Sequence, residues 1–489
     1  MPSAADVAVV GAGVAGLAAA IDAANAGLRV VVVEAFAEPG GAAETGSALT
    51  CIVDTPLQRT LGIQDSVELA LRDWIAWGGA AEVDAGWARA YLERSRADVY
   101  DWLEALGVEW SSVIQTEGNS VPRQHQPAGG GAAVMAHVLA AAVDMPIEWR
   151  LATTVVELVL RDGAVAGVVA ERGPQREQID ARAVLLATGG FAGNPSLLAK
   201  FGPKLSHAGP VLVGGAEQAT GRGHELASAA GADLVGLERI WTYAYGVPDP
   251  ADPSGQRGLA LWLTGDIWLN GGGRRFHDES QRGGASATPA LLRQPGATSW
   301  SIFDAREAGR IEIPHPRYRR DDGSPDRVAI EGLLSSSPAV ARADSVAALA
   351  PATGLPRSAF AATIAEVRSW EGGTGVDPHF GRPLDTFRPL REPPFYAVRF
   401  RPLARKCLGG VRTDRDARVL RPDGSIVDRL YAAGELAGMG GGHMNGLAGL
   451  EGTMFGPSLF SGRIAARAIA RARSPQSASE SLSSARRSG

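Results

Sequence analysis

A glycine-rich turn between two short hydrophobic segments constrains this chain more than any other feature. Residues 6–34 read DVAVVGAGVAGLAAAIDAANAGLRVVVVE. Val7–Val10 has the pattern of a parallel strand buried on both faces, and Val30–Val33 repeats it. Residues 14–26 between them have the composition of a helix, and Gly27 stands at its C-cap position. The segment therefore predicts a β-α-β unit.

The glycines of the turn follow the spacing G-x-G-x-x-G. Gly11 permits the tight turn, Gly13 lets a pyrophosphate approach the backbone, and Gly16 lets the helix pack closely on the strand. Glu34 ends the second strand, where a carboxylate can accept hydrogen bonds from both ribose hydroxyls and disfavours a 2′-phosphate. We predict a dinucleotide site that is not built for NADP. The alternative is a glycine-rich turn in an ordinary α/β domain.

Length and composition narrow the class of protein. A chain of 489 residues is expected to form two or three domains. The net charge of −5 gives no field that would attract nucleic acid or an acidic membrane surface. Cys51 and Cys407 lie far apart and outside any CxxC pattern, which fits a reducing compartment. With no room for a signal peptide and no apolar run of ~20 residues, we expect a cytoplasmic protein without membrane or nucleic-acid partners.

Four later segments carry glycine-rich loops suited to a polar or anionic ligand. Gly40 and Gly41 follow the second strand, where the alternative is a plain surface turn. Residues 123–131 (RQHQPAGGG) lead into a helix, and residues 185–190 (LLATGG) read as a strand that ends in a turn. Residues 430–435 (LYAAGE) are a strand followed by more glycine, ahead of a long helix over 452–470.

Domain boundaries follow from shifts in composition. We expect a first domain over 1–239, an inserted domain over 240–392, a return to the first domain over 393–473 and a disordered tail over 474–489. The inserted domain should contain a hairpin of residues 267–269 and 274–277 around a three-glycine turn. A second complete nucleotide fingerprint does not occur. One dinucleotide is therefore expected, without a dedicated NAD(P)H domain.

These segments together resemble one flavoprotein family over about residues 5–470. The family includes soluble fumarate reductases, succinate dehydrogenase flavoproteins, 3-ketosteroid dehydrogenases and L-aspartate oxidases. Its motifs here are the opening fingerprint with Glu34, and residues 39–41 (PGG), 125–130 (HQPAGG), 186–191 (LATGGF), 273–279 (GRRFHDE), 394–397 (PFYA), 408–414 (LGGVRTD) and 430–435 (LYAAGE).

The resemblance implies a doubly wound, Rossmann-like α/β domain for FAD and an inserted α+β domain that caps the substrate. It also implies hydride transfer between flavin N5 and a substrate carbon, and FAD is expected to be noncovalent because no histidine attachment motif lies near Thr45 to Ser47. The expected FAD contacts are Gly11, Gly13, Ala15, Gly16, Glu34, Ala35, Gly40, Gly41, Ala42, Ala43, Gly129, Gly130, Val155, Ala187, Thr188, Gly189, Gly434, Glu435, Gly452, Thr453 and Met454.

Four residues are candidates for chemistry. Arg282 matches the proton-donating arginine of the fumarate reductases, although its distance from the preceding motif is one residue shorter. Lys406 replaces the family's substrate-binding histidine, His443 lies in the last glycine-rich loop, and Tyr243 lies where the capping domain usually has His-Pro-Thr. Such sites need an acid or base and a group that polarises the substrate.

Other family positions have changed, so neither fumarate nor a steroid is securely implied. The second dicarboxylate-binding arginine is Gly446, and the steroid-dehydrogenase tyrosine is replaced by Ala448. We predict an FAD oxidoreductase acting on a CH–CH or C=C bond beside a carbonyl or carboxylate of a small molecule, with an external electron donor or acceptor. The alternatives are an amine or alcohol oxidase that uses O2, and a non-catalytic flavin carrier or redox sensor.

Overall fold

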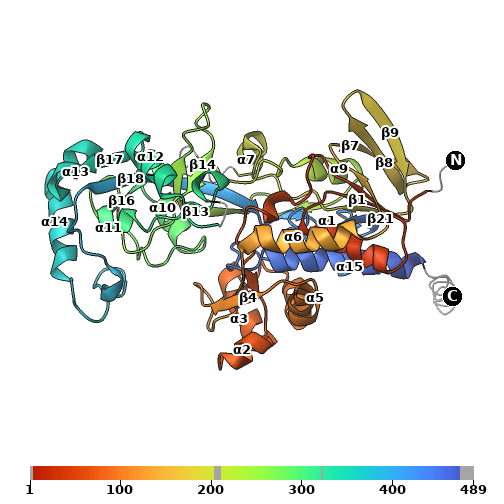
Figure 1. Cartoon of the computed structure of the whole chain (residues 1–489), viewed down its shortest axis with the longest axis horizontal. Coiled ribbons are helices and arrows are strands. Elements are labelled where there is room, and N and C mark those ends of the chain that lie inside the picture. Colours follow the sequence, from red (N-terminus) through yellow and green to blue (C-terminus); the bar gives the residue numbers. More distant parts are fainter. Residues whose placement is uncertain (1–3, 203–210, 321–322, 474–489) are drawn as a thin grey trace. The chain divides into compact units, whose positions relative to one another are not determined.

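The computed structural model describes residues 4–202, 211–320 and 323–473 (Figure 1). The chain forms two compact units. The first contains the N-terminal part up to Phe191, Glu217–Arg239 and the part from Cys407 onwards; the second contains Ala192–Ala216 and Ile240–Lys406. The predicted disordered tail lies outside the described residues.

A six-stranded sheet forms the centre of the first unit, in the order β20-β21-β10-β1-β2-β6. Its strands are β1 Val7–Val10, β2 Val30–Val33, β6 Ile147–Arg150, β10 Val184–Leu186, β20 Arg418–Leu420 and β21 Ile426–Ala432. All neighbours pair in parallel except β20, which is antiparallel at one edge. The strand order reverses beside β1, because β2 lies on one side and β10 on the other. Ligands of doubly wound sheets bind at the carboxyl ends of the strands at such a point.

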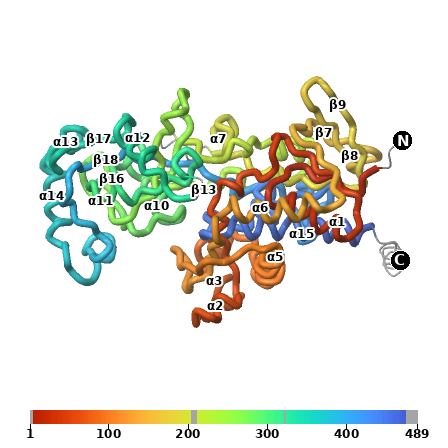
Figure 2. Tube along the Cα trace, viewed as in Figure 1, coloured from red at the N-terminus to blue at the C-terminus, as the bar shows by residue number. Residues whose placement is uncertain are grey.

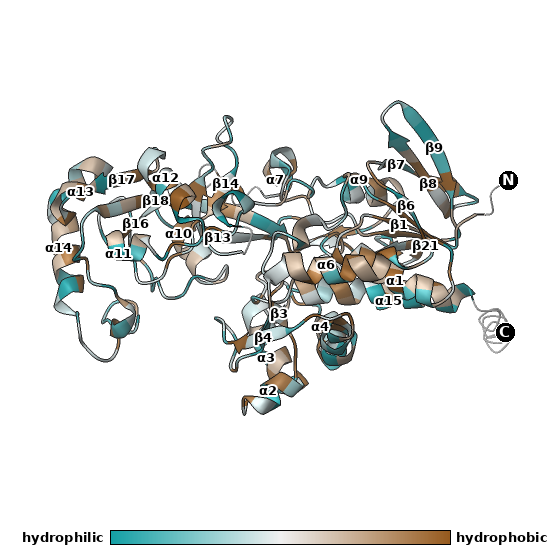
Figure 3. Cartoon of the chain, in the orientation of Figure 1, coloured by the Kyte–Doolittle hydropathy of each residue, from teal (hydrophilic) through white to brown (hydrophobic). Residues whose placement is uncertain are grey.

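Three helices pack together in the first unit: α1 Val14–Asn25, α6 Gly130–Val143 and α15 Phe455–Arg473 (Figure 1). Small residues permit their close approach, since a Cβ on Gly462 of α15 would lie 2.1 Å from the carbonyl oxygen of Ala15 in α1. An antiparallel sheet of β7 Thr154–Arg161, β8 Ala164–Arg172 and β9 Gln175–Asp180 packs by β8 against β10 and β21. Its outer strand β9 is polar and exposed (Figure 3).

The first unit also contains a helical region before α6. Trp74, Trp87 and Tyr91 are buried there. The remaining elements of this unit are η1 Gly41–Ala43, β3 Thr50–Cys51, α2 Pro56–Thr60, α3 Val67–Gly78, α4 Ala85–Ser95, a π-helical turn η2 Arg96–Tyr100, α5 Asp101–Ala105, β4 Trp110–Ile114, β5 Gln124–Pro127, α9 Arg222–Ala229, β12 Leu234–Val235 and β19 Gly410–Val411.

The second unit is an α+β arrangement around one long strand, β18 Phe395–Cys407. Four strands pair with or neighbour β18 directly: β11 Leu212–Val213, β13 Ile240–Pro248, β16 Ser299–Phe303 and β17 Val340–Ala343. The others are β14 Gly258–Ala260 beside β13 and β15 Ile267–Leu269 beside β16. Its helices, which Figure 2 follows along the chain, are α7 Pro195–Phe201, α10 Ala287–Leu292, η3 Pro295–Ala297, α11 Ala305–Ala308, η4 Pro316–Tyr318, α12 Arg327–Ser336, α13 Val346–Thr353, α14 Arg357–Ser369 and η5 Leu384–Thr386.

Two sequence expectations need correction. The limits of the second unit are not 240 and 392, because β18 pairs with β11 and therefore joins residues 192–216 and 393–406 to this unit. The expected hairpin is wrong, because β15 pairs with β16 and residues 274–277 form no strand. Arg275 in that segment instead forms a buried ion pair with Glu279, which follows it.

Candidate functional site

The turn from β1 to α1 shows three different uses of glycine. A Cβ on Gly11, which has φ +103°, would lie 2.5 Å from the carbonyl oxygen of Ala187. A Cβ on Gly16 would lie 1.9 Å from the carbonyl oxygen of Gly11. A Cβ on Gly13 would meet nothing within 4 Å. Packing therefore requires the first and third glycines, whereas the second faces open space.

That open space adjoins the N-terminus of α1. Gly13 is the N-cap residue and supplies no side-chain acceptor, and the first turn contains no acidic residue. The first N–H groups of a helix have no intrahelical partner, and together with the helix dipole they favour a bound anion. The geometry suits a pyrophosphate group.

Glu34 lies beside the same turn. Its Oε2 accepts a hydrogen bond from the N–H of Ala12 (2.7 Å), and its Oε1 accepts one from Phe36 (2.9 Å). The side chain is half-buried, and Ala35 after it is exposed. The strand end thus holds a carboxylate next to the anion-binding turn, which fits a ribose.

Two further loops contact this turn in succession. Gly40 donates its N–H to the carbonyl of Ala12 (3.0 Å), and a Cβ on Gly41 would lie 3.2 Å from Cα of Gly13. Residues 42 and 43 continue this loop as η1, and a Cβ on Gly131 of α6 would lie 2.1 Å from the carbonyl oxygen of Ala43. The N-cap of α6 is Gly129, with Gly130 as its first helical residue. The sequence-predicted positions from 11 to 16, 34, 40 to 43 and 129 to 130 therefore lie in connected loops.

The other strand ends complete this side of the first unit. Ala187 donates its N–H to Val10 (2.8 Å), and the hydroxyl of Thr188 is buried without a hydrogen-bond partner in the described chain. A Cβ on Gly434 would lie 3.0 Å from Cβ of Ala15. Glu435 accepts a hydrogen bond from the N–H of Cys407 through Oε1 (2.9 Å).

The last loop differs in detail from its prediction. The helix α15 begins at Phe455, not at Gly452, which has φ +85°. The hydroxyl of Thr453 bonds to Asn445 Oδ1 (2.8 Å) and to the carbonyl of Leu450 (2.7 Å), so it stabilises the loop itself. Met454 is buried. Val155 lies in the β7–β9 sheet, where its carbonyl accepts a hydrogen bond from Arg222 (3.3 Å).

Arg282, in the second unit, is only 5% exposed. Its Nη2 donates a hydrogen bond to Asp266 Oδ1, and its guanidinium carbon lies 4.9 Å from the ring centre of Trp268 and 5.8 Å from that of Trp262. Nε and Nη1 are buried and have no hydrogen-bond partner among the described residues. Nη2 of the guanidinium is therefore held, whereas Nε and Nη1 retain their donors.

A buried ion network lies beside Arg282. Arg275 donates two hydrogen bonds of 2.7 Å to Glu279, and Arg382 donates one of 3.0 Å to the same carboxylate. Burial alone would raise the pKa of Glu279, but the hydrogen bonds of Arg275 and the charges of Arg382 and Arg275 bring it below its usual range. The motif residues 273–279 therefore support structure in this unit. Arg382, 103 residues away from Glu279 in the chain, and Asp266 were missed from the sequence.

The other catalytic candidates divide between the units. Lys406 is half-buried near the end of β18. Tyr243 on β13 stacks on Tyr245, with ring centres 4.8 Å apart, and the guanidinium carbon of Arg405 lies 5.9 Å from its ring centre. These two and Arg282 belong to the second unit, whereas His443 belongs to the first.

His443 is half-buried, and its Nδ1 has no hydrogen-bond partner within the described ranges. Burial lowers the pKa of His443, and the charges of Arg239 and Arg412 act in the same direction, whereas Asp84 and Glu82 oppose them. The neutral form of the imidazole is therefore favoured.

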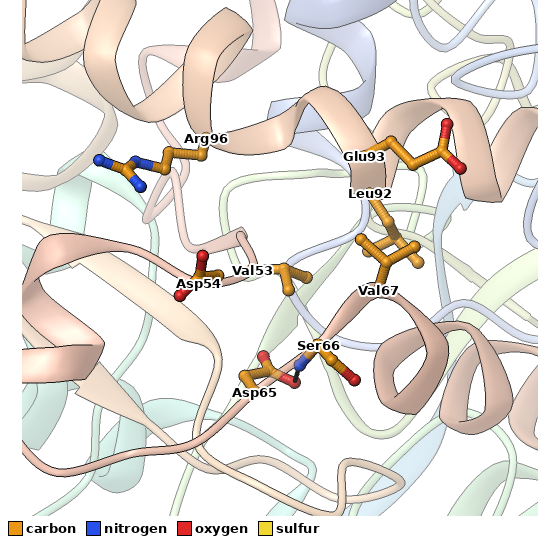
Figure 4. Close-up of a pocket in the computed structure, with 8 residues that line it drawn as sticks. All are labelled: Val53, Asp54, Asp65, Ser66, Val67, Leu92, Glu93 and Arg96. Carbon is orange, nitrogen blue, oxygen red and sulfur yellow. Dashed lines mark hydrogen bonds between the residues drawn. The ribbon is translucent and has the colours of Figure 1, made fainter.

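A pocket of about 300 Å³ opens elsewhere in the first unit (Figure 4). Its polar lining includes Asp54, Asp65, Glu93 and Arg96, and the N–H of Ser66 donates to Asp65 (2.9 Å). It contains none of the sequence-predicted site residues.

Comparison with known proteins identifies the cofactor. Residues 6–454 match the family described as FAD binding domain. The chain belongs to this family. FAD is therefore its cofactor, and the open space at Gly13, the uncapped α1 and the carboxylate of Glu34 fit the pyrophosphate and ribose of FAD.

The relatives are named as dehydrogenases and reductases. A KsdD-like steroid dehydrogenase of Mycobacterium tuberculosis is 31% identical over 95% of this chain and 96% of its own. A probable fumarate reductase of Shewanella frigidimarina is 30% identical over 94% of this chain and 74% of its own. The present protein is accordingly an FAD-dependent oxidoreductase of the dehydrogenase or reductase type.

Solved structures that are similar to this chain have the same fold. An open flavocytochrome c3 fumarate reductase has a TM-score of 0.76 at 28% identity, covering 96% of this chain and 78% of that one. A 3-ketosteroid-Δ4-(5α)-dehydrogenase of Rhodococcus jostii, in complex with 4-androstene-3,17-dione, has a TM-score of 0.72 at 26% identity, covering 96% and 97%. No helix in the described part of the chain is long and apolar enough to cross a membrane.

Proposed function

We propose that this oxidoreductase acts on a CH–CH or C=C bond beside a carbonyl or carboxylate group of a small molecule. The observation that carries the proposal is the buried Arg282, whose Nε and Nη1 retain their donors. A cation of this kind can bind the substrate oxygen or hold the proton for the carbon next to the hydride site. The relatives named as steroid dehydrogenase and fumarate reductases support this class of bond.

Each residue has a defined task in this proposal. FAD, when bound, supplies or accepts the hydride. Arg282 transfers the proton, and Lys406 binds or polarises the activating carbonyl or carboxylate. His443 and Tyr243 are the next candidates for substrate contact. The second unit serves as the capping domain.

Noncovalent FAD and an external electron partner belong to the same proposal. Only one nucleotide fingerprint occurs in the sequence, and FAD takes it. A dye, a quinone, a reduced flavin or a redox protein should therefore exchange electrons with the enzyme.

A cytoplasmic location is also proposed, supported by Cys51 and Cys407, which are both buried and form no disulfide.

The test is a turnover screen with purified, FAD-loaded protein. The probes are 4-androstene-3,17-dione with an oxidising dye and fumarate with a reduced viologen, extended to other α,β-unsaturated carbonyl compounds and their saturated forms. Turnover of at least one probe is expected, and the FAD should be released intact by acid. If no probe is turned over and none perturbs the flavin spectrum, the proposal fails, and a flavin carrier becomes the better reading.

An O2-dependent oxidase of amines or alcohols is the competing enzyme class. It would release hydrogen peroxide with air as sole acceptor, and it would turn over saturated amines or alcohols that have no adjacent carbonyl group. Measuring peroxide in the same screen separates the two classes.

A further inference from the structure

Asp266 is a buried residue whose carboxylate and backbone carbonyl both accept hydrogen bonds. It directly precedes β15 and is only 1% exposed. Its Oδ1 accepts from Arg282 Nη2, and its Oδ2 accepts from the hydroxyl of Ser301 and from Trp268 Nε1 (2.7 Å). Its carbonyl oxygen accepts from Arg382 Nη1 (2.7 Å). Neither carboxylate oxygen is left to face solvent or a ligand.

This arrangement determines the orientation of Arg282. A guanidinium has five N–H donors in a rigid fork, so an acceptor on one nitrogen fixes the direction of the others. Asp266 engages only Nη2, and the rings of Trp262 and Trp268 lie against the guanidinium. The Nε and Nη1 donors, which point in different directions, are left unengaged.

The nearby carboxylates do not compete for these two donors. Glu279 is engaged by Arg275 and Arg382, and Asp377 accepts from Arg275 (3.3 Å). Asp266 is consequently the carboxylate that compensates the buried charge of Arg282. An uncompensated buried cation is strongly disfavoured, so removing Asp266 should drive the guanidinium towards another partner.

We propose that Asp266 is the positioning residue of Arg282: it holds the guanidinium through Nη2 so that the unengaged Nε and Nη1 donors are available to the substrate. The inference rests on the proposed proton-transfer role of Arg282. Asp266 itself touches no substrate and exchanges no proton in this scheme. Its contribution is orientation, and misplacement of a catalytic group by about 1 Å can cost 10²-fold in rate.

Crystal structures of the FAD-loaded protein test the positioning directly. In Asp266→Ala, the guanidinium of Arg282 is expected to leave its place and take a new acceptor. Asp266→Asn, which retains an oxygen acceptor, should keep it in place and provides a second variant if the alanine variant does not fold. Ser301→Ala is the matched control, because it removes a buried hydrogen bond to Oδ2 without touching Arg282. An unmoved Arg282 in Asp266→Ala, or a displaced Arg282 in both Asp266→Asn and Ser301→Ala, overturns the proposal.

Kinetics with a substrate from the turnover screen provide the second readout. Asp266→Ala should lower kcat about 10²-fold with KM changed less than about 3-fold, and Asp266→Asn should recover part of the loss. In an Arg282→Gln background, Asp266→Ala should cost nothing further. An equal loss in both backgrounds would indicate a merely structural role. If Arg282→Gln leaves kcat unchanged, the proposed function of Arg282 fails, while the crystal structures still decide whether Asp266 positions it.

Discussion

The carboxylate of Glu34 bonds to the backbone N–H groups of Ala12 and Phe36. One side chain thus joins the end of β2 to the turn that precedes α1. An ionised carboxylate can accept several hydrogen bonds, so Glu34 can serve both the turn and the ribose of FAD. Hydrogen bonds to charged groups contribute about 1.5–3 kcal/mol each.

Glu34→Ala should weaken FAD binding by about 2–3 kcal/mol, which corresponds to roughly 30- to 150-fold in Kd. Titration of the apoprotein with FAD, followed by the quenching of flavin fluorescence, measures this change. Glu38→Ala is the control, since Glu38 is exposed on the following loop. Equal affinities of the Glu34 and Glu38 variants would contradict the assignment.

Substitutions of Arg282 and Lys406 should have different effects on kcat and KM. Arg282→Gln should lower turnover by 10²- to 10⁴-fold, the range for loss of a general acid or base, with the flavin spectrum and substrate binding largely retained. Lys406→Met should also raise KM, because it removes the cation proposed to bind the substrate oxygen. Steady-state kinetics with the substrate from the screen check both. A variant that folds, binds FAD and keeps wild-type kinetics removes its residue from the mechanism.

At the scale of elements, the β1–α1 turn makes a paired prediction. A Cβ on Gly13 meets no protein atom, so Gly13→Ala should leave the unfolding free energy of the apoprotein within about 1 kcal/mol of wild type while FAD affinity falls. A Cβ on Gly16 collides with the carbonyl of Gly11, so Gly16→Ala should destabilise the apoprotein by about 3 kcal/mol or more. Urea unfolding and FAD titration measure the two effects. Normal FAD affinity in Gly13→Ala would exclude the pyrophosphate from this position.

The same turn explains what the sequence could predict. Residues 6–34 have clear local patterns, so strand, helix, strand and terminal acid could be assigned from them, and the structure agrees. The partner of β15 could not be assigned in this way. In the segment after β15, Arg275 pairs with Asp377 and Glu279 pairs with Arg382, both far along the chain. Long-range ion pairs leave no local period. Asp266 left one signal, a charged residue directly before an apolar strand.

Both units bury ion pairs, and Arg123 with Asp65 is one in the first unit. The second contains the network of Arg275, Glu279 and Arg382, in which each ion has a partner of opposite charge. Such groups should remain ionised until strongly acidic pH, because the pKa of Glu279 lies below its usual range. The first unit in addition buries His125 and His224 in their neutral form, and these histidines should become protonated in much milder acid.

Burial lowers the pKa of both histidines to about 4. The ring of His125 bonds to Thr55 Oγ1 (2.7 Å) and to the carbonyl of Arg123 (3.0 Å). The ring of His224 packs edge-on against Phe191, and neither of its nitrogens has a hydrogen-bond partner in the described ranges. Since the unfolded chain binds protons first, each histidine's contribution to stability is complete above about pH 6.5 and declines as pH falls towards about 4.

At about pH 5 each of these histidines should cost about 2 kcal/mol of the unfolding free energy available at about pH 7.5. His224→Leu removes one titrating group from an apolar site, so the loss of stability between these two pH values should be about 2 kcal/mol smaller than in wild type. Urea unfolding at both pH values measures the difference. His137→Leu, at an exposed position of α6, should leave it unchanged. If His224→Leu loses as much stability on acidification as wild type, then His224 is already protonated in the folded protein or is not buried as described.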